Sequence, residues 1–402
     1  MLYNNKDMKK AKDNMQPKKS DYTAEQSPLF PDGALAVEGK DRSFVFTRKM
    51  AWLLVGIITL GLVLFNLLGF TVFKGTAEVT SYQWSKNDQF DVKKYSYLTA
   101  DEDGDFCILQ LSDMHILNGV NVPDVKTFDL AKRLVERSNP DLIVLTGDVV
   151  FTWNNKRAFK KVIEFFDDIC KARNIYWSVV FGNHDETGYS DKKVLSNLLT
   201  ASKYCLFEIG PTNLDDGKYG NCLGNYAINL KTAEGKIGCS LVMIDSNAGG
   251  TSMREGAYAP ISSSTVEWYE WFVNGMTAQN GGDVVPSLAF FHIPLVQSRL
   301  MMQGLPLGQD GYFEKVCSSD LDTGMFARMQ ALKSTVATFS GHDHQNYYQG
   351  TYEDSGILLT NCVSCGYCTY GDVDLKGGRV ITLNLNEVGL GLDTYVIFAN
   401  QL

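Results

Sequence analysis

From Asp105 to the C-terminus, short apolar runs alternate with amphipathic stretches, and no other feature limits the possible folds as strongly. The alternation predicts helices over 127–138, 158–172 and 265–275. It predicts strands at 106–112, 141–146, 176–181, 241–245, 287–291, 336–340 and 357–361, and an antiparallel pair at 379–385 and 392–398. An early βαβαβ pattern followed by hairpin-like strands predicts an α/β fold, in which two sheets form an α/β/β/α sandwich with helices outside.

Polar motifs follow several of these predicted strands directly. They are Asp113-Met-His115, Gly147-Asp148, Gly182-Asn183-His184-Asp185, His292 and Gly341-His342-Asp343-His344. All five histidines of the chain fall at such a position. Since ligand sites in layered α/β folds lie at the ends of strands, we expect these side chains to converge on one rim.

The predicted rim offers carboxylates, imidazoles and an amide oxygen. This set suits divalent manganese, iron or zinc better than calcium. Two such ions about 3.5–4 Å apart need one bridging carboxylate and about three terminal ligands each, and the number of ligands fits two ions. Taken alone, a histidine after a strand is more often a hydrogen-bonded core residue. The ordered combination, with no histidine left over, indicates a metal site.

A second feature is the uncharged stretch Met50–Phe73, whose 24 residues include a single polar amide, Asn66. At about 1.5 Å per residue, a helix of this length spans a hydrocarbon core of about 30 Å. A buried core helix and a cleaved signal peptide are the alternatives, but no polar face is present and the leader is long. Arg48 and Lys49 precede the stretch, so the positive-inside rule places the N-terminus in the cytoplasm and the following domain outside.

The expected organisation is therefore a disordered cytoplasmic tail (1–49), a transmembrane helix (50–73), a linker with an edge element (74–104) and a catalytic domain (105–402). The net charge is −9, and residues 1–49 carry ten basic against seven acidic residues. The rest of the chain is therefore acidic, which argues against binding to nucleic acid. No pattern indicates a protein partner.

Nine cysteines lie beyond the apolar stretch, three of them in the motif formed by Cys362, Cys365 and Cys368. Three thiolates without a fourth nearby ligand make a poor structural zinc site. A metal or redox role, a local disulfide and small buried residues all remain open for this motif.

The motif order D-x-H, G-D, G-N-H-D, H and G-H-x-H resembles the calcineurin-like metallophosphoesterase superfamily over about residues 105–385. The stretches DLIVLTGD, VVFGNHDE, GNYAINL, LAFFHIPL and FSGHDHQNYYQG are similar to its purple-acid-phosphatase-like branch of plant and fungal proteins. The resemblance implies one metal held by Asp113, His115, Asp148 and His344. It implies a second metal held by Asp148, Asn183, His292 and His342, with Asp148 as the bridge.

The same resemblance implies hydrolysis of a small phosphate ester by water activated at two metals. His184 would contact the phosphoryl group and assist the leaving oxygen, and Asp185 would orient or charge-stabilise that imidazole. Arg254 is a candidate for binding the substrate phosphate. In true purple acid phosphatases a tyrosine three residues past the bridging aspartate binds ferric iron. Phe151 stands there in this chain, so no coloured ferric site is expected.

Four functions are compatible with these patterns. A phosphomonoesterase is favoured, and a phosphodiesterase or nucleotide pyrophosphatase with the same metals is the main alternative. An inactive membrane-tethered binding module would be expected to have lost at least one ligand, whereas this set is complete. A membrane sensor that signals through the tail has no evident mechanism, since one span joins an unfolded segment to the domain.

Overall fold

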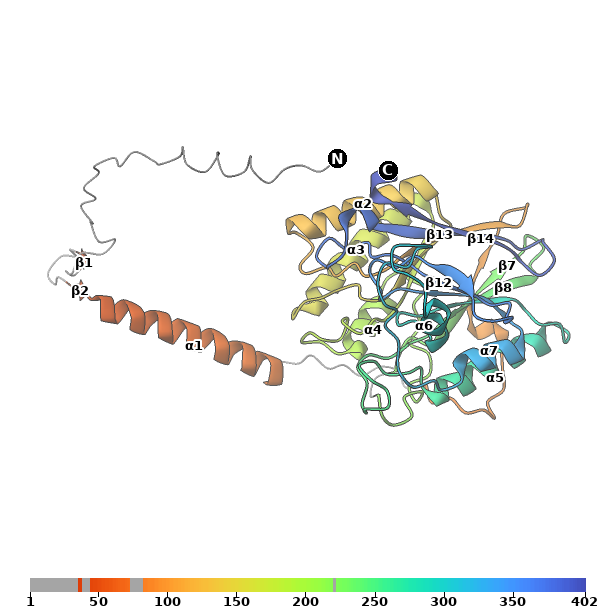
Figure 1. The fold of residues 1–402 in the computed structure, drawn as a ribbon, viewed down its shortest axis with the longest axis horizontal. Helices are drawn as coiled ribbons and strands as arrows, with labels where there is room; N and C mark the ends of the chain where they lie inside the picture. The colour runs from red at the N-terminus through yellow and green to blue at the C-terminus, as the bar shows by residue number, and fades with distance from the viewer. Residues whose placement is uncertain (1–34, 38–43, 73–81, 220–221) are drawn as a thin grey trace, which may run out of the picture. The chain divides into compact units, whose positions relative to one another are not determined.

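The computed structural model describes residues 35–37, 44–72, 82–219 and 222–402. The chain divides into two compact units, residues 1–68 and 69–402. Figure 1 traces both along the chain. Most of the tail expected at 1–49 lies outside the described residues.

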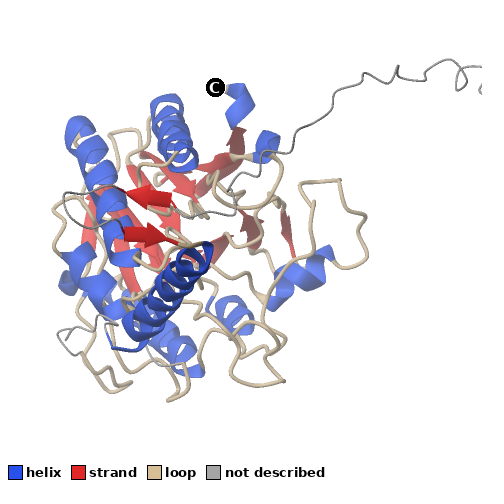
Figure 2. Ribbon diagram, turned by 90° about the vertical axis from the view of Figure 1, so that its left-hand side faces the viewer, coloured by secondary structure: helices blue, strands red, loops and turns tan. Residues whose placement is uncertain are grey.

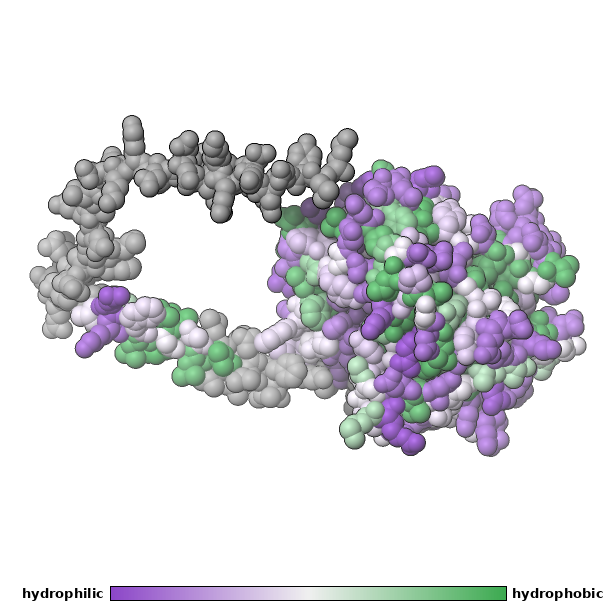
Figure 3. All heavy atoms as spheres, viewed as in Figure 1, coloured by the Kyte–Doolittle hydropathy of each residue, from purple (hydrophilic) through white to green (hydrophobic). Residues whose placement is uncertain are grey.

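The first unit contains the antiparallel strands β1 (Leu35–Val37) and β2 (Phe44–Phe46) and most of helix α1 (Arg48–Val72). Side chains of α1 are described for residues 48–61 and 63, and Figure 3 shows hydrophobic residues along this part. Within the described residues, no helix combines the length and apolarity needed to cross a membrane. The span expected at 50–73 extends into residues that are not described.

A five-stranded sheet forms one layer of the second unit. Its order is β14-β13-β4-β5-β6. The strands are β4 (Asp105–Leu111), β5 (Leu142–Thr146), β6 (Tyr176–Val180), β13 (Gly377–Asn384) and β14 (Gly391–Phe398). β4, β5 and β6 run parallel, as the early βαβαβ pattern requires, and β13 and β14 form the predicted antiparallel pair.

A seven-stranded sheet forms the other layer, in the order β11-β12-β10-β9-β8-β7-β3. Its strands are β3 (Ser96–Thr99), β7 (Tyr226–Lys231), β8 (Ile237–Met243), β9 (Ser287–Phe290), β10 (Thr335–Ser340), β11 (Gln349–Thr351) and β12 (Leu358–Asn361). β9 and β10 lie parallel at its centre, so the loops that follow them emerge at the same edge.

Helices cover the outer faces of the two sheets. α2 (Val122–Ser138) and α3 (Asn155–Arg173) pack on the five-stranded sheet, and α4 (Lys192–Thr200) packs against α3. On the other side α5 (Ser263–Gln279) packs against α7 (Met325–Leu332), while α6 (Val296–Met302) follows the loop after β9. Within the second unit, Figure 2 shows the strands of the two sheets inside and most helices outside, which confirms the predicted two-sheet α/β sandwich.

The side chains of the seven-stranded sheet are apolar on both of its faces, so each face packs against a hydrophobic core. In β8, Leu241 and Met243 enter the core shared with the five-stranded sheet, whereas Val242 enters a second core with α5 and α7. Successive strand side chains point to opposite faces, so one apolar run fills both cores.

Helix α2 begins five residues earlier than predicted. The side chain of Asn121 accepts a hydrogen bond from the Asp124 amide at 2.9 Å, and Pro123 occupies the first turn. Both residues favour a helix start, because a polar cap satisfies a free amide and proline lacks one. The start depends on these cap residues rather than on the apolar periodicity used to predict it.

Candidate metal centre

The polar motifs meet where the strands of both sheets end. Asp113 and His115 follow β4, Asp148 follows β5, and Asn183 and His184 follow β6. From the seven-stranded sheet, His292 follows β9, and His342 and His344 follow β10. Six of these residues form two groups with metal-ligand geometry, Asp113 with His115 and His344, and Asp148 with His292 and His342.

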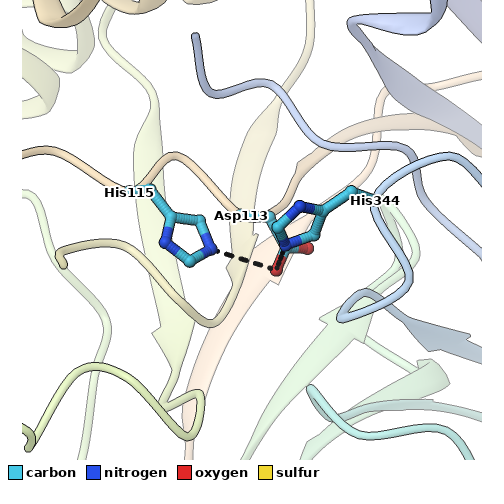
Figure 4. A group of neighbouring side chains, drawn as sticks. All are labelled: Asp113, His115 and His344. Atoms are coloured by element: carbon cyan, nitrogen blue, oxygen red, sulfur yellow. Dashed lines mark ion pairs between the residues drawn. The ribbon is translucent and has the colours of Figure 1, made fainter. Parts of the chain in front are cut away.

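The first group surrounds the Asp113 carboxylate. His344 Nε2 lies 3.3 Å and His115 Nε2 lies 3.8 Å from Asp113 Oδ1. Figure 4 shows the two imidazoles turning a ring nitrogen toward that carboxylate from different loops. The other oxygen, Oδ2, accepts hydrogen bonds from Ser112 Oγ at 2.6 Å and from the His342 amide at 2.9 Å, which fixes the carboxylate.

The second group gathers around His292, which is fully buried. Its Nε2 lies 3.3 Å from Asp148 Oδ2, 3.1 Å from Asn183 Oδ1 and 3.2 Å from His342 Nδ1. Asn183 was expected as a ligand of the second metal, and the structure places its amide oxygen within this group.

Asp148 links the two groups. Its Oδ2 lies 3.5 Å from His115 Nε2 of the first group and 3.3 Å from His292 Nε2 of the second. A buried carboxylate that faces both sets of ligands is the arrangement a pair of ions requires. The two groups therefore fit one dinuclear centre.

Glycines in the motifs make this crowding possible. A Cβ on Gly182 would collide with the amide and carboxylate of Asp148. A Cβ on Gly341 would collide with Ser112 Oγ and approach Asp113 Oδ2 to 2.9 Å. Gly147, whose φ is +83°, would carry a Cβ 2.6 Å from His292 Nδ1. Only glycine fits where backbone approaches ligand so closely.

Four of the expected ligands have left-handed backbone conformations. The φ angles are 52° at Asp113, 48° at His115, 49° at Asp148 and 74° at His342. Residues other than glycine rarely adopt positive φ, and such conformations cluster at functional sites. Here the strained backbone turns each side chain back toward the shared centre.

Buried polar atoms without hydrogen-bond partners show that the site suits cations. Among the described residues, Asp113 Oδ1 and His115 Nε2 are buried and have no hydrogen-bond partner. Buried polar groups are normally paired, and leaving one unpaired costs about 1–3 kcal/mol. Metal ions coordinated here would satisfy atoms that protein neighbours leave free.

Hydrogen bonds behind two of the imidazoles orient their rings. His292 Nδ1 lies 2.8 Å from the Thr146 carbonyl oxygen, which can only accept, so Nδ1 carries a proton and Nε2 is the nitrogen left to bind a metal once its own proton is lost. His344 Nδ1 lies 2.8 Å from Thr369 Oγ1, which leaves its Nε2 facing Asp113. Such backing contacts orient histidine ligands in metal sites.

Burial and charge shape the acidities of these groups. Burial opposes ionisation of Asp113 and Asp148, but the imidazoles of His344 and His292 hold the pKa of the respective carboxylate well below its usual range. Burial also opposes a charge on His292, yet the Asp148 and Asp113 carboxylates raise its pKa to about 10. Burial and the charge on His292 lower the pKa of His342 to about 3.

His184 lies beside this centre, outside both groups. Its Nε2 is 4.0 Å from Asp148 Oδ2, and its backbone amide donates to Asp148 Oδ1 at 2.8 Å. Its side chain is 36% exposed. Burial, aided by the neighbouring imidazole of His115 and opposed by Asp148, lowers the pKa of His184. The structure thus places His184 as a partly open imidazole at the edge of the site, in surroundings that favour its neutral form.

Asp185 does not have the contact expected of it. Its two carboxylate oxygens accept backbone amides, from Val150 at 3.0 Å and from Gly182 at 2.8 Å, instead of orienting the His184 imidazole. It therefore ties the loop after β6 to the loop after β5. Burial and the charge of Asp148 raise the pKa of Asp185 to about 7, although both amide bonds oppose that shift.

An open cavity of about 330 Å³ lies over the ligands. Arg254, the candidate for phosphate binding, is not among its lining residues and is exposed in the 248–259 hairpin. Six residues that the sequence did not assign to the site do line it: Phe151, Tyr258, Cys317, Cys368, Thr369 and Tyr370. Tyr370 belongs to the aromatic segment Tyr367–Tyr370, whereas Tyr258 stands in no comparable segment.

All nine cysteines lie in the described part of the chain and carry free thiols. Cys362 and Cys365 are fully buried, and the Cys368 thiol donates to Asp124 Oδ1 at 3.1 Å. Of the possibilities open for this motif, the structure shows small packed residues, with neither a local disulfide nor a metal group at these positions.

Comparison with known proteins agrees with this geometry. Residues 107–346 match the family described as Calcineurin-like phosphoesterase. The chain is similar to Probable inactive purple acid phosphatase 28 of Arabidopsis thaliana, 28% identical over 319 residues, which cover 73% of this chain and 78% of the relative. Probable inactive purple acid phosphatase 29 of the same plant is 26% identical over 81% of this chain and 87% of its own length. Phosphatase DCR2 of Saccharomyces cerevisiae is 25% identical over 72% of this chain and 53% of the yeast protein.

Proposed function

The chain belongs to the calcineurin-like phosphoesterase family, and we propose that it is an active phosphomonoesterase with a dinuclear metal centre. The observation that carries this proposal is the buried Asp148 carboxylate facing two groups of ligands. Two relatives are named inactive, so activity has to be argued from this chain itself. Its complete set of carboxylates, imidazoles and Asn183 supports catalysis, because an abandoned site need not keep its ligands unpaired in the core.

The ligand residues would hold two divalent ions of manganese, iron or zinc. Asp113, His115 and His344 would hold one ion, and Asn183, His292 and His342 the other, with Asp148 between them. When bound, such ions acidify a water molecule and neutralise charge on phosphoryl oxygens.

The chain's own part in the reaction falls to His184. It lies at the open edge of the centre, and its lowered pKa keeps it neutral near pH 7. A neutral imidazole can donate its remaining N–H to the departing oxygen of the ester. The amide bond from His184 to Asp148 fixes its position relative to the ligands.

Paired substrates test this function on the full chain in detergent. The purified protein, loaded with manganese or zinc, is assayed with a nitrophenyl phosphate and a bis-nitrophenyl phosphate, and its metal content is measured. Faster hydrolysis of the monoester is expected, and EDTA should abolish it. Preference for the diester would favour a phosphodiesterase. Two bound ions without turnover of either ester would identify an inactive module.

We also propose that the uncharged segment of residues 50–73, part of which lies outside the described residues, anchors the domain in a membrane, with the N-terminus in the cytoplasm. The support is the uncharged sequence of residues 50–73, the basic pair before it, and the exposure of apolar side chains such as Trp52 and Ile57. Protease added to intact cells should remove the 75–402 domain. Complete protection of the domain, with cleavage after permeabilisation, would reverse this topology.

A further inference from the structure

The cavity over the metal ligands has aromatic walls. Phe151, Tyr258 and Tyr370 come from three separate loops and all line it. The Phe151 ring centroid lies 4.6 Å from that of His184, the Tyr258 centroid 4.5 Å from that of His342, and the Tyr370 centroid 4.1 Å from that of His344. Each ring thus flanks a different histidine of the site.

These rings are not core residues. Phe151 is 45% exposed and Tyr370 is 58% exposed, although aromatic side chains of this size gain most from burial. Tyr258 is partly buried. Exposed rings gathered beside a ligand site supply a surface on which another flat apolar group can pack.

Hydrogen bonds hold the loops that carry the three rings, and one of these bonds holds the Tyr370 side chain itself. The Tyr370 hydroxyl donates to Glu314 Oε2 at 3.0 Å, and Lys376 Nζ donates to the Tyr370 carbonyl at 3.0 Å. Tyr258 pairs with Gly249 across its hairpin, and the Phe151 amide donates to the Ile116 carbonyl at 3.2 Å. A preformed surface loses little conformational freedom when a ligand packs on it.

The charges around the cavity also indicate which substrates it can accept. None of the described residues lining it is lysine or arginine, and the two charged side chains bonded to Tyr370 from outside the lining, Glu314 and Lys376, have opposite signs. Additional phosphate groups on a substrate would therefore meet no basic side chain there. Sites that recognise several phosphates ordinarily supply arginine or lysine for them.

Resting on the proposed function, we propose the class of substrate: an ester of a single phosphoryl group with an alcohol that carries a flat apolar ring. The phosphoryl group would lie at the metal ligands, and the ring would pack among Phe151, Tyr258 and Tyr370. Nucleoside triphosphates and pyrophosphate would be poor substrates, because their extra charges face an aromatic wall.

The test compares 2-phenylethyl phosphate with butyl phosphate in the metal-loaded full chain. Both esters release a primary alkoxide of similar basicity, so their kcat/KM ratio reports recognition of the ring rather than leaving-group chemistry. A roughly tenfold preference for the phenyl ester is expected. ATP and pyrophosphate should be hydrolysed more slowly than either.

Substitutions of the aromatic lining residues test whether these rings cause the preference for the phenyl ester. Phe151→Ala and Tyr258→Ala should each lower the ratio several-fold, and Phe151→Leu, which keeps apolar volume without a ring, should lower it as well. Trp153→Ala is the matched control, because Trp153 is 57% exposed on the same loop and does not line the cavity. Its ratio should be unchanged.

The outcomes separate the two proposals. Turnover of both esters at equal kcat/KM, a ratio insensitive to the wall variants, or faster hydrolysis of ATP would overturn the substrate class while leaving the phosphatase intact. Absence of turnover for every ester in protein that binds two ions would instead overturn the proposed function.

Discussion

Replacing Asp148 by asparagine tests the shared centre most directly. The change keeps the shape of the side chain but removes the negative charge that faces His115 at 3.5 Å and His292 at 3.3 Å. Asp148 is 1% exposed, so little solvent compensates. Removing one partner of a buried charge pair typically costs about 3–5 kcal/mol. Since 1.4 kcal/mol is a factor of ten, metal affinity should fall roughly 10²–10⁴-fold.

The measurement is a calorimetric titration of the EDTA-stripped full chain with manganese or zinc, together with metal content and phosphatase rate. Asp148→Asn should bind both ions weakly and lose nearly all turnover. Asp245→Asn is the control, because Asp245 is equally buried and pairs with Lys192 Nζ at 2.8 Å. The other hydrogen-bond partners of its carboxylate, Leu223 and Asn247, are not ligands. That variant should lose stability and keep its metal affinity. Two ions bound to Asp148→Asn at unchanged affinity, with substantial turnover, would refute the bridging assignment.

Three further predictions concern single groups. His184→Ala should keep both metals yet lose turnover, most strongly for esters with poor leaving groups; loss of metal would instead make His184 a ligand. In the metal-free protein His292, with its pKa raised to about 10, is protonated at pH 7, so ion binding should release about one proton there and affinity should rise with pH up to about 10. Calorimetry in buffers of different ionisation enthalpy measures this proton, and affinity independent of pH between 6 and 9 would contradict it. Thr369→Val should weaken metal binding about 10–100-fold, because it removes the contact that orients His344, and unchanged affinity would show that the hydroxyl is dispensable.

The strands and the metal ligands could be predicted because both leave local signals. An apolar run such as Leu142–Thr146 marks a buried strand, and the polar residues after it mark the strand end. Parallel strands then bring those ends together whatever the intervening sequence. Helix α4 escaped prediction because it has only 9 residues and begins with two lysines.

Contacts that depend on three-dimensional packing were harder to predict. Tyr258 contacts His342 although 83 residues separate them, and nothing near Tyr258 marks it as part of the site. Asp185 is expected beside the His184 imidazole, as the family resemblance implies. The backbone turn instead directs its carboxylate to the amides of Gly182 and Val150, and this depends on loop geometry.

Each group of ligands draws on both sheets, and this has a mechanical consequence. Asp113 and His115 follow a strand of the five-stranded sheet, and His344 follows a strand of the seven-stranded sheet. In the second group, Asp148 comes from the five-stranded sheet and His292 and His342 come from the seven-stranded one. Metal ions bound there would be coordinated by residues of both sheets and would therefore cross-link the two sheets at one end of the sandwich. Chelation should then loosen that end first, so that hydrogen exchange quickens in the loops after β4, β5, β9 and β10 before the distant ends of the same strands respond.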